Sequence, residues 1–585
     1  MIAIDASEMG LRPGSSEDLT LTLKRAMTRL PESEIQLNFQ PGDYFFRGKF
    51  AGTRFASIAN HDSGRKEIVF DLSGRKDWSV NGNGARFWFS GEAIPFAANE
   101  GMGIEVSDLS IDWIDPLIVE ARIEEANANS MVLCMPGAVP YLVLSGRLLF
   151  NIGGDIFPLI RVMEIDSSRR APAFASGDNF GAVDGATSGW DFNWRFEQLE
   201  GKRIRVEGNW PRMPVPGNYV YCKFGRRTNP GFWWKDSRDI IMKDVSIHYT
   251  GAMGVLAEGC ENVALTRVKV IPPEDCSRLT SARADATHFV CCRGDVDLVD
   301  CKFHGQHDDG ANVHGIYFPV VKILGKADLI VERAHFQQRG CLIGKPGDRY
   351  QFVRANTLAS VGEFRINEFN EINDRYVELI LDSPLPLGVK LGDGIENLSA
   401  SPALRVEGCS FEGNRARGLL VGTPRKALVV GCTFHVPGSA IRVSSDCGGW
   451  YESGAVKDFT IRNNRFLNTN YATPGWPHWG LASIDLEGKG EPVGSVVSGV
   501  RVENNSFVTF GPPVLNAAAT RDLVFSGNNI ESSQEFPWEG EAEPLVYLGS
   551  CLNTAVHSNE NTTARKMLRS GPMKFAPVQV NRGYK

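Results

Sequence analysis

A segment of about 23 residues that recurs along the chain constrains the fold more than any other feature. PALRVEGCSFEGN is followed by KALVVGCTFHVPG, so that Cys409 and Cys432 lie 23 residues apart, as do Phe411 and Phe434. Related segments with Asn in place of Cys occur in VKDFTIRNNRF and SGVRVENNSF. A period in the twenties with several short β-rich runs per repeat predicts a parallel β-solenoid, in which each coil stacks its strands on the next.

Matched positions in such a solenoid should form inward-facing ladders of Val, Ile, Phe and Cys, which a β-sandwich would not explain. Two stretches break the repeat with alternating strand patterns and tight turns, and we interpret them as inserted barrels. The sequence therefore predicts an all-β fold, a right-handed parallel β-helix with two inserted antiparallel β-barrel-like domains. The predicted segments are a cap helix with the first coils, a first insertion, a central β-helix, a second insertion and the C-terminal coils, at residues 1–116, 117–225, 226–318, 319–395 and 396–585.

Composition narrows the function classes. A formal net charge of −7 over 585 residues argues against a nucleic-acid-binding protein, which normally presents a basic face. No run of about 18 apolar residues is present, so we expect no membrane-spanning helix. The opening MIAIDASEMG lacks the basic and apolar segments of a signal peptide. The cysteines follow no zinc spacing, so we expect no zinc site among them, and we expect no cofactor.

The stretch HDDGANVHG, residues 307–315, sets two aspartates side by side. Asp285 lies 23 residues before Asp308 and 24 before Asp309, which is about one coil. Because adjacent coils are about 4.8 Å apart, the three carboxylates should cluster on one outer surface. Gly310 is expected to allow a β-bulge that turns both aspartates outward. Such a cluster holds both a protonated and an ionised carboxyl group, as hydrolysis of a glycosidic bond requires.

A single aspartate at a solenoid turn is often there only because aspartate suits turns. This alternative is weaker for the aspartate pair together with Asp285 one coil away. His307, Asn312 and His314 could line the same cleft, although His314 equally suits a structural role in the turn. The coil face also offers His248, Tyr249 and His288, each of which alone is more often structural than functional. Sugar sites also need flat aromatic faces and bidentate hydrogen-bond groups. Candidates of these kinds from other segments are Trp233, Trp234, Arg415, Arg417, Asp446 and Glu452.

At these residues the chain resembles glycoside hydrolase family 110, the α-1,3-galactosidases that remove terminal α-galactose, including that of the blood-group B antigen. The resemblance runs over most of the chain, and its most specific strings are DDGANVHG and WYESGAVKD. It implies a β-helix with β-barrel insertions and inverting hydrolysis without a metal. By matching position, it implies Asp308 as the general acid, with Asp285 and Asp309 holding the attacking water as general base.

The resemblance also implies a partner and a location. The substrate would be a terminal α-galactosyl oligosaccharide or glycoconjugate, branched as in blood-group B or linear. Members of the family are typically exported, which implies a periplasmic or secreted enzyme whose leader is absent from this sequence. A long solenoid with exposed barrels could also pair through them as a homodimer.

Other functions stay open at the level of sequence. A polygalacturonase-like hydrolase also uses three aspartates on a β-helix, although here a histidine–glycine pair follows the aspartates by only a few residues. A non-catalytic glycan-binding solenoid would bind without hydrolysis, and the three-carboxylate cluster disfavours it. A calcium-dependent lyase would use an acidic cluster for metal and a Lys or Arg base.

Overall fold

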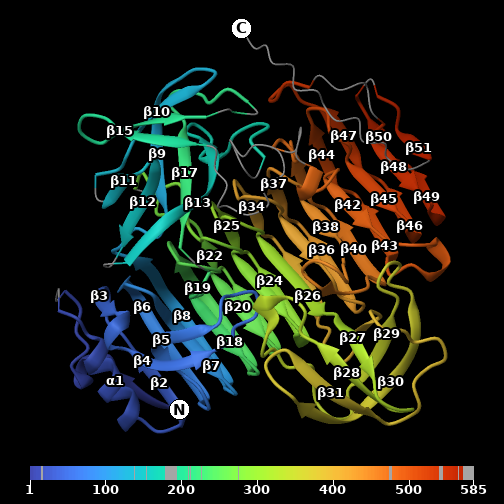
Figure 1. Cartoon of the computed structure of the whole chain (residues 1–585), viewed down its shortest axis with the longest axis horizontal. Coiled ribbons are helices and arrows are strands. Elements are labelled where there is room, and N and C mark those ends of the chain that lie inside the picture. Colours follow the sequence, from blue (N-terminus) through green and yellow to red (C-terminus); the bar gives the residue numbers. More distant parts are fainter. Residues whose placement is uncertain are drawn as a thin grey trace.

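The chain forms a parallel β-helix with two β-barrel-like insertions, as the repeat predicts (Figure 1). The structure is a computed structural model that describes residues 1–14, 17–137, 139–152, 155–177, 194–208, 210, 212–225, 227–274, 276–472, 477–538, 544–563 and 565–570.

The larger parallel sheet passes through every coil of the β-helix, and its inward side chains form most of the continuous apolar core. Its strands are β1 (Ile2–Asp5), β2 (Ser33–Asn38), β3 (Gly42–Arg47), β6 (Lys76–Ser90), β8 (Met102–Trp113), β19 (Arg238–Ile247), β21 (Glu261–Thr266), β22 (Lys269–Val270), β24 (Arg293–Val299), β25 (Lys302–His304), β33 (Ala403–Glu407), β34 (Ser410–Glu412), β36 (Lys426–Val430), β37 (Thr433–His435), β40 (Asp458–Arg462), β41 (Arg465–Leu467), β43 (Ser498–Glu503), β44 (Ser506–Thr509), β46 (Arg521–Ser526), β47 (Asn529–Ser532), β49 (Leu552–His557) and β50 (Glu560–Asn561).

A second sheet runs along the same axis and completes each coil. We call it the site sheet, because the candidate site lies at the amino ends of three of its inner strands. Its strands are β4 (Gly52–Ala56), β5 (Gly64–Asp71), β7 (Ala93–Asn99), β18 (Phe232–Lys235), β20 (Val255–Glu258), β23 (Thr287–Val290), β26 (Ala311–Ile316), β35 (Leu419–Val421), β38 (Ile441–Val443), β42 (Ile484–Glu487), β45 (Leu515–Ala518), β48 (Val546–Gly549) and β51 (Leu568–Ser570). The short strand β39 (Glu452–Ser453) pairs antiparallel with β26.

The coils stack in the register that the repeat predicts. Phe411 pairs with Phe434 across adjacent coils, and the two rings stack with centroids 4.8 Å apart. The stack continues to Phe466 at 5.2 Å and to Phe507 at 4.6 Å. Because each coil presents the same residue type at the same inward position, one coil can be laid on the next without rearranging the core.

Asparagine replaces cysteine in the later coils and forms a buried ladder. Asn505 donates from Nδ2 to the Ile461 carbonyl and to Asn528 Oδ1, each at 3.0 Å. Its own Oδ1 accepts from the backbone and side-chain nitrogens of Asn464 at 2.9 and 3.0 Å. The ladder therefore satisfies amides that the turn between strands would otherwise leave buried and unpaired.

The first insertion leaves the β-helix after β8 and returns at β18, and it is an antiparallel sheet around a core of its own. Its strands are β9 (Val119–Ala126), β10 (Ser130–Cys134), β11 (Tyr141–Leu144), β12 (Arg147–Ile152), β13 (Asp155–Asp166), β14 (Ala171–Pro172), β15 (Arg195–Gln198), β16 (Arg203–Glu207) and β17 (Tyr219–Phe224).

The second insertion follows β26 and closes into a barrel, seen in yellow-green and olive at the lower right of Figure 1. Its strands are β27 (Phe318–Ile323), β28 (Asp328–Glu332), β29 (Arg349–Val353), β30 (Ser360–Glu371), β31 (Tyr376–Leu381) and β32 (Gly394–Asn397). The two insertions project on either side of the central coils, which include β18, β20 and β26 (Figure 1).

Helix α1 (Thr20–Arg29) packs near the N-terminal end of the β-helix, with Leu23, Ala26 and Met27 buried at the spacing of one helix face. Short 3₁₀ turns are η1 (Ala6–Met9), η2 (Gly48–Phe50), η3 (Phe336–Gln338), η4 (Pro477–Trp479) and η5 (Pro492–Gly494). Within the part of the chain that the structure describes, no helix combines the length and the apolar character needed to cross a membrane.

The asparagine ladder predicts a stability effect. Replacing Asn505 by Ala should lower the free energy of unfolding by about 2 kcal/mol, because the buried backbone N–H of Asn464 loses its acceptor. Chemical denaturation followed by tryptophan fluorescence measures this. Arg501→Ala, an exposed change on β43 in the same coil, is the control, and equal midpoints for the two variants would contradict the ladder's contribution.

Candidate active site

Three neighbouring coils contribute a charged side chain at one level, at the amino ends of β23, β26 and β35. Asp285, Asp309 and Arg417 each lie two residues before their strand, and the pairing of the strands places them in register across the coils. The backbone ladder continues through this turn, since the amide of Ala286 donates to the Asp309 carbonyl at 2.9 Å. Asp309 and Arg417 are 108 residues apart in the sequence, and most of the residues between them form the second insertion. In the fold, the two residues lie on adjacent coils.

The three aspartates meet as predicted, but the predicted outer surface and β-bulge are wrong. Oxygen atoms of Asp285, Asp308 and Asp309 all lie within 4.8 Å of one another. They are largely buried, and the aspartate pair precedes β26 in a turn, where strand alternation does not apply. Gly310 is required for close packing instead, because a Cβ there would lie 2.4 Å from a ring carbon of Phe411.

Asp308 is held by two arginines. Its Oδ1 lies 2.8 Å from Nη1 of Arg415, and its Oδ2 accepts from Nη2 of Arg227 at 3.1 Å. Burial alone would raise the pKa of Asp308, but the guanidinium charges of Arg415 and Arg227 lower it below the ordinary value. With 17% of its side chain exposed, against 5% and 3% for Asp285 and Asp309, Asp308 is also the most accessible of the three.

Asp309 is clamped by one arginine on both oxygens. Nε and Nη2 of Arg417 donate to its Oδ1 and Oδ2, each at 2.8 Å, and the backbone amide of Arg417 donates at 3.1 Å. Burial raises the pKa of Asp309 to about 7, with Arg417 lowering it and the negative charge of Asp308 raising it. This carboxyl group is therefore poised between its neutral and ionised forms near neutral pH.

Asp285 contacts a pair of buried histidines. Its Oδ2 lies 2.6 Å from Nδ1 of His288, whose Nε2 lies 2.9 Å from Nε2 of His314. The Nδ1 of His314 in turn lies 2.6 Å from the carbonyl oxygen of Gly315. Burial raises the pKa of Asp285 to about 8, with a further contribution from the charge of Asp308. Burial lowers the pKa of His288 to about 4, so its imidazole is neutral at neutral pH.

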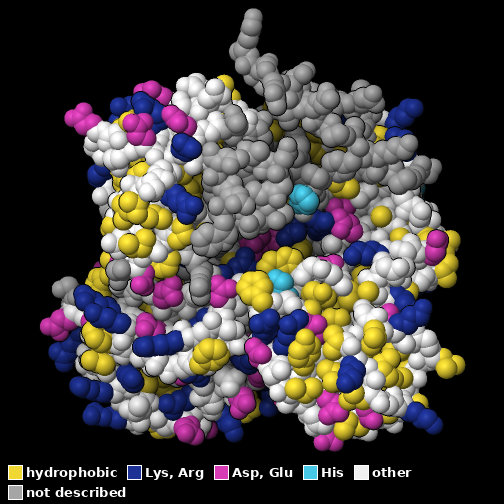
Figure 2. Space-filling view, in the orientation of Figure 1, with side chains coloured by type: hydrophobic (Ala, Val, Ile, Leu, Met, Phe, Trp, Pro, Cys, Tyr) yellow, Lys and Arg dark blue, Asp and Glu magenta, His cyan; other side chains and the backbone are white. Residues whose placement is uncertain are grey.

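A carboxylate and two amides form a further wall of the site. Glu452, on β39, accepts from Nδ2 of Asn312 at 3.4 Å and from Nδ2 of Asn60 at 3.5 Å. The Oδ1 of Asn60 is buried and has no hydrogen-bond partner among the residues that the structure describes. Figure 2 shows a hollow near the middle of this face, with basic and acidic side chains gathered inside it. Such convergent polar groups in a recess suit the hydroxyl groups of a sugar.

The comparisons with known proteins agree with this site. The sequence matches the family described as GLAA-B beta-barrel domain I over residues 119–220 and GLAA-B beta-barrel domain II over residues 328–395. It is 31% identical to Alpha-1,3-galactosidase A of Shewanella woodyi, over 95% of this chain and 90% of that protein. The chain belongs to glycoside hydrolase family 110.

Two further relatives in the family have similar coverage. Alpha-1,3-galactosidase B of Phocaeicola vulgatus is 29% identical over 91% of this chain and 92% of that protein. Alpha-1,3-galactosidase B of Bacteroides thetaiotaomicron is 26% identical over 99% of this chain and 94% of that protein. The family 110 resemblance seen in DDGANVHG and WYESGAVKD therefore extends over the β-helix and both insertions.

Four of the residues predicted to bind substrate have other roles. Trp233 and Trp234 are 2% and 0% exposed and pack in the core, because β18 is an inner strand of the site sheet with both faces covered. Asp446 accepts backbone N–H groups of its own loop, including that of Gly448 at 2.9 Å. The ring of His307 is buried against Tyr221, with centroids 3.6 Å apart, and thereby attaches the first insertion to the site.

Other site residues were not predicted from the sequence. Arg227 follows the first insertion, and Asn60 and His61 lie between β4 and β5, more than 150 residues away along the chain. His61 is fully buried, with Nδ1 2.8 Å from the Ala59 carbonyl, and its Nε2 has no hydrogen-bond partner in the described part of the chain. Each is a single residue outside the repeat, so neither spacing nor composition connects it to the aspartates.

The spacing of the three carboxylates would also suit a divalent cation. Arg227, Arg415 and Arg417 already supply positive charge to this cluster, with at least one guanidinium contact to Asp308 or Asp309 each. These guanidinium groups already offset the negative charge that a bound cation would offset.

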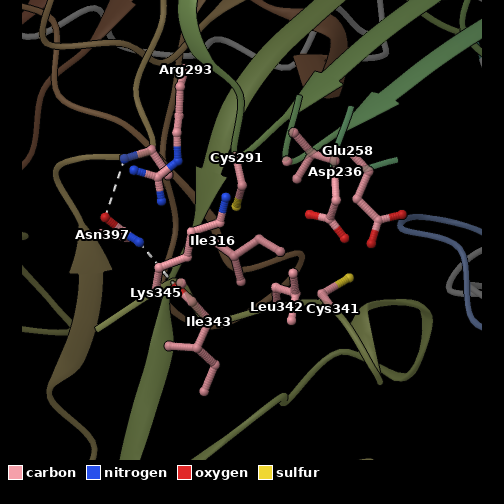
Figure 3. Close-up of a pocket in the computed structure, with 14 residues that line it drawn as sticks. Asp236, Glu258, Cys291, Arg293, Ile316, Cys341, Leu342, Ile343, Lys345 and Asn397 are labelled. Atoms are coloured by element: carbon pink, nitrogen blue, oxygen red, sulfur yellow. Dashed lines mark hydrogen bonds between the residues drawn. The ribbon is translucent and has the colours of Figure 1, made fainter. Parts of the chain in front are cut away.

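A second pocket lies at the opposite, carboxyl ends of β20, β23 and β26, beside the second insertion (Figure 3). Asp236 and Glu258 lie side by side on one wall, with Cys341 and Leu342 below them. Glu258 is paired with Lys235 at 3.3 Å and accepts the Ala59 amide at 3.2 Å. Because Glu258 is committed to protein partners, we assign no function to this pocket.

The Asp309–Arg417 pair predicts a pH-dependent stability difference. A carboxyl group whose folded pKa is above its unfolded value of about 3.9 destabilises the fold progressively as pH rises toward the folded pKa. Arg417→Met should raise the pKa of Asp309 further, so the variant should lose about 1.4 kcal/mol per pH unit above pH 7, where the wild type has stopped losing stability at this site.

Thermal unfolding at pH 6 and pH 8 measures this difference. The gap between wild type and Arg417→Met should widen at pH 8, and it should not widen for Arg425→Met, an exposed arginine near the same coil. A gap that is the same at both pH values would show that Arg417 does not control the ionisation of Asp309.

Proposed function

We propose that the chain is an exo-acting α-1,3-galactosidase that releases terminal α-1,3-linked galactose with inversion of configuration. The observation that supports this most is the cluster of Asp285, Asp308 and Asp309 on adjacent coils, in a chain whose relatives are named α-1,3-galactosidases. Branched blood-group B structures and linear α-1,3-galactosides are the proposed substrates.

Asp308 is the proposed general acid. As the most accessible of the three carboxyl groups, it is the one placed to reach the glycosidic oxygen. Its arginine neighbours favour the ionised form, so it must gain a proton before the bond breaks. Asp309, with a pKa of about 7, can supply that proton, and Arg417 then stabilises the ionised Asp309 that remains. The carboxylates therefore titrate as a unit.

Asp285 and Asp309 are the proposed holders of the attacking water. Both oxygens of Asp309 accept from Arg417, which makes this carboxylate a poor nucleophile, and Asp285 is hydrogen-bonded to His288. These restraints support water attack with inversion. Carboxyl groups in inverting enzymes are usually about 6.5–9.5 Å apart. The oxygens of the three aspartates lie closer, within 4.8 Å, which is nearer to the separation of about 5–5.5 Å that is typical of retaining enzymes. Inversion is therefore proposed from the contacts that occupy Asp309 and Asp285, and the anomer of the first product is the decisive test.

Glu452, Asn312 and Asn60 are the proposed contacts for galactose hydroxyl groups. They form one hydrogen-bonded group, and the Oδ1 of Asn60 has no partner within the described residues. A sugar hydroxyl could donate to that oxygen and to Glu452. Polygalacturonase-like activity, the alternative kept from the sequence, has no specific observation in its favour here, and turnover of polygalacturonate beside α-galactosides separates the two.

The acid assignment predicts an effect that depends on the leaving group. Asp308→Asn should lower kcat on an α-1,3-linked disaccharide by about 10³-fold, because the departing sugar needs a proton. A dinitrophenyl α-galactoside should be affected far less, since its leaving group departs without protonation. Steady-state kinetics with both substrates measures the contrast. Asp285→Asn, which affects the attacking water alone, should impair both substrates similarly.

Asp300→Asn is the matched control, because Asp300 is an exposed aspartate in the same part of the β-helix and has a positive φ of 53°, which asparagine tolerates. Near-normal turnover of the disaccharide by Asp308→Asn would show that Asp308 is not the acid. Equal losses on both substrates would show that Asp308 acts on the attacking water instead.

The cluster also predicts the alkaline limit of activity. Bond cleavage needs protons in the cluster, and the pKa values of Asp309 and Asp285 are about 7 and about 8. The kcat/KM of the wild type should therefore fall with rising pH through a limb between about pH 7 and pH 8. Enzyme held at pH 9 and returned to pH 6 should recover fully, and a profile that stays flat to pH 9 would contradict the shared-proton cluster.

A further inference from the structure

His288 and His314 form a buried hydrogen-bonded pair directly behind Asp285. From Asp285 Oδ2 to His288 Nδ1 is 2.6 Å, from His288 Nε2 to His314 Nε2 is 2.9 Å, and from His314 Nδ1 to the Gly315 carbonyl is 2.6 Å. The side chains are 1% exposed for His288 and 3% for His314. Hydrogen bonds enclosed to this degree must each contain one proton, because an unpaired contact between two acceptors is repulsive.

The contact between His314 and the Gly315 carbonyl fixes the position of every proton in this series of hydrogen bonds. A carbonyl oxygen can only accept, so Nδ1 of His314 carries a hydrogen. Burial lowers the pKa of His314, and its neutral ring then offers Nε2 as an acceptor. Nε2 of His288 must donate to it, which leaves Nδ1 of His288 as an acceptor when that ring is neutral. One proton must therefore lie between Asp285 Oδ2 and His288 Nδ1.

Charged groups around the pair offset part of the cost of a positive charge on His288. Burial and Arg227 lower the pKa of His288, whereas the carboxylates of Glu452, Asp309 and Asp308 raise it. Glu452 also lies 3.6 Å from Nε2 of His314, and the buried His61 interacts with His288. A positive charge formed on His288 would thus face three acidic side chains, which offset part of the cost of burying it.

We infer that His288 is the proton acceptor behind Asp285: as the attacking water passes its proton to one oxygen of Asp285, the proton on Oδ2 moves to Nδ1 of His288. This inference rests on the proposed function and assigns a role that the carboxylates alone do not provide. The water oxygen forms the new bond to the anomeric carbon, and Asp308 gives its proton to the departing oxygen. Asp285 ends with one proton, as it began, and His288 ends as an imidazolium that later returns its proton to solvent.

The transfer explains how a carboxyl group with a raised pKa can act as a base. A protonated Asp285 cannot accept a second proton unless the first one leaves, and the 2.6 Å contact with His288 gives it a direct path. His314 is a positioning residue: its contact with the Gly315 carbonyl keeps His288 with Nε2–H donating and Nδ1 open. A proton relay of this kind contributes to rate and leaves substrate binding unchanged.

The proton positions can be measured without any substrate. In the full-length protein labelled with ¹⁵N-histidine, NMR distinguishes a protonated ring nitrogen from a bare one, and His288→Gln and His314→Gln assign the two signals. At pH 6 we expect His314 to be protonated at Nδ1 and bare at Nε2, and His288 to be protonated at Nε2. A His314 that is bare at Nδ1, or a His288 that is bare at Nε2, would overturn the inference.

Kinetics then tests the relay itself. His288→Gln should lower kcat by about 10²-fold with KM within about threefold of wild type, and it should move the alkaline limb of the pH profile. His314→Gln, which can still accept from His288 and donate to Gly315, should retain more activity than His314→Phe. His435→Gln is the matched control, since His435 is a partly buried histidine beside a carboxylate, 3.7 Å from Glu535, in another coil.

The outcomes separate this inference from the proposed function. A merely structural His288 would lower activity by the same factor at every pH and leave the limb in place, which would overturn the relay. If wild type lacks activity on every α-galactoside, the proposed function fails, while the NMR result still decides the proton positions. Thermal unfolding of each variant confirms that the comparison is between folded proteins.

Discussion

The hydrogen-bonded stacking of one coil on the next is the constraint on which the site depends. Parallel pairing of β23, β26 and β35 fixes Asp285, Asp309 and Arg417 at the same level on neighbouring coils. Side chains at one level are then about 4.8 Å apart whatever their chemistry. The fold can therefore hold two carboxyl groups closer than their charges would allow in a flexible loop, and it supplies a guanidinium group on the next coil.

The short distances between the three carboxyl groups determine which of them are paired with arginine and which keep a proton. Burying three carboxylates together would cost several kcal/mol per ion unless they are paired or protonated. Both solutions occur: Arg227, Arg415 and Arg417 pair with Asp308 and Asp309, while burial keeps a proton on Asp285. The same balance leaves the cluster with protons that can be exchanged near neutral pH. The chemistry that we propose thus uses the arrangement that makes the cluster stable.

The sequence predicts the architecture well because the β-helix is encoded locally. A repeat such as Cys409 and Cys432, with Phe411 and Phe434, states the register of the coils directly, and the structure confirms it. The meeting of Asp285 with Asp308 and Asp309 follows from the same spacing. Arg227 and Asn60 could not be predicted, because insertions and loops bring them to the site and no period relates them to it. Trp233 and Trp234 were misjudged because residue type does not reveal that β18 is covered on both faces.

The central claim is that water, held by Asp285 and Asp309, attacks the anomeric carbon directly. ¹H NMR of the first-formed sugar, with blood-group B trisaccharide and linear α-1,3-galactobiose as substrates, tests this most directly. Inversion of an α-galactoside predicts β-galactose as the first product, followed by slow mutarotation. Release of α-galactose first would mean that a carboxylate forms a covalent intermediate, and it would contradict the account.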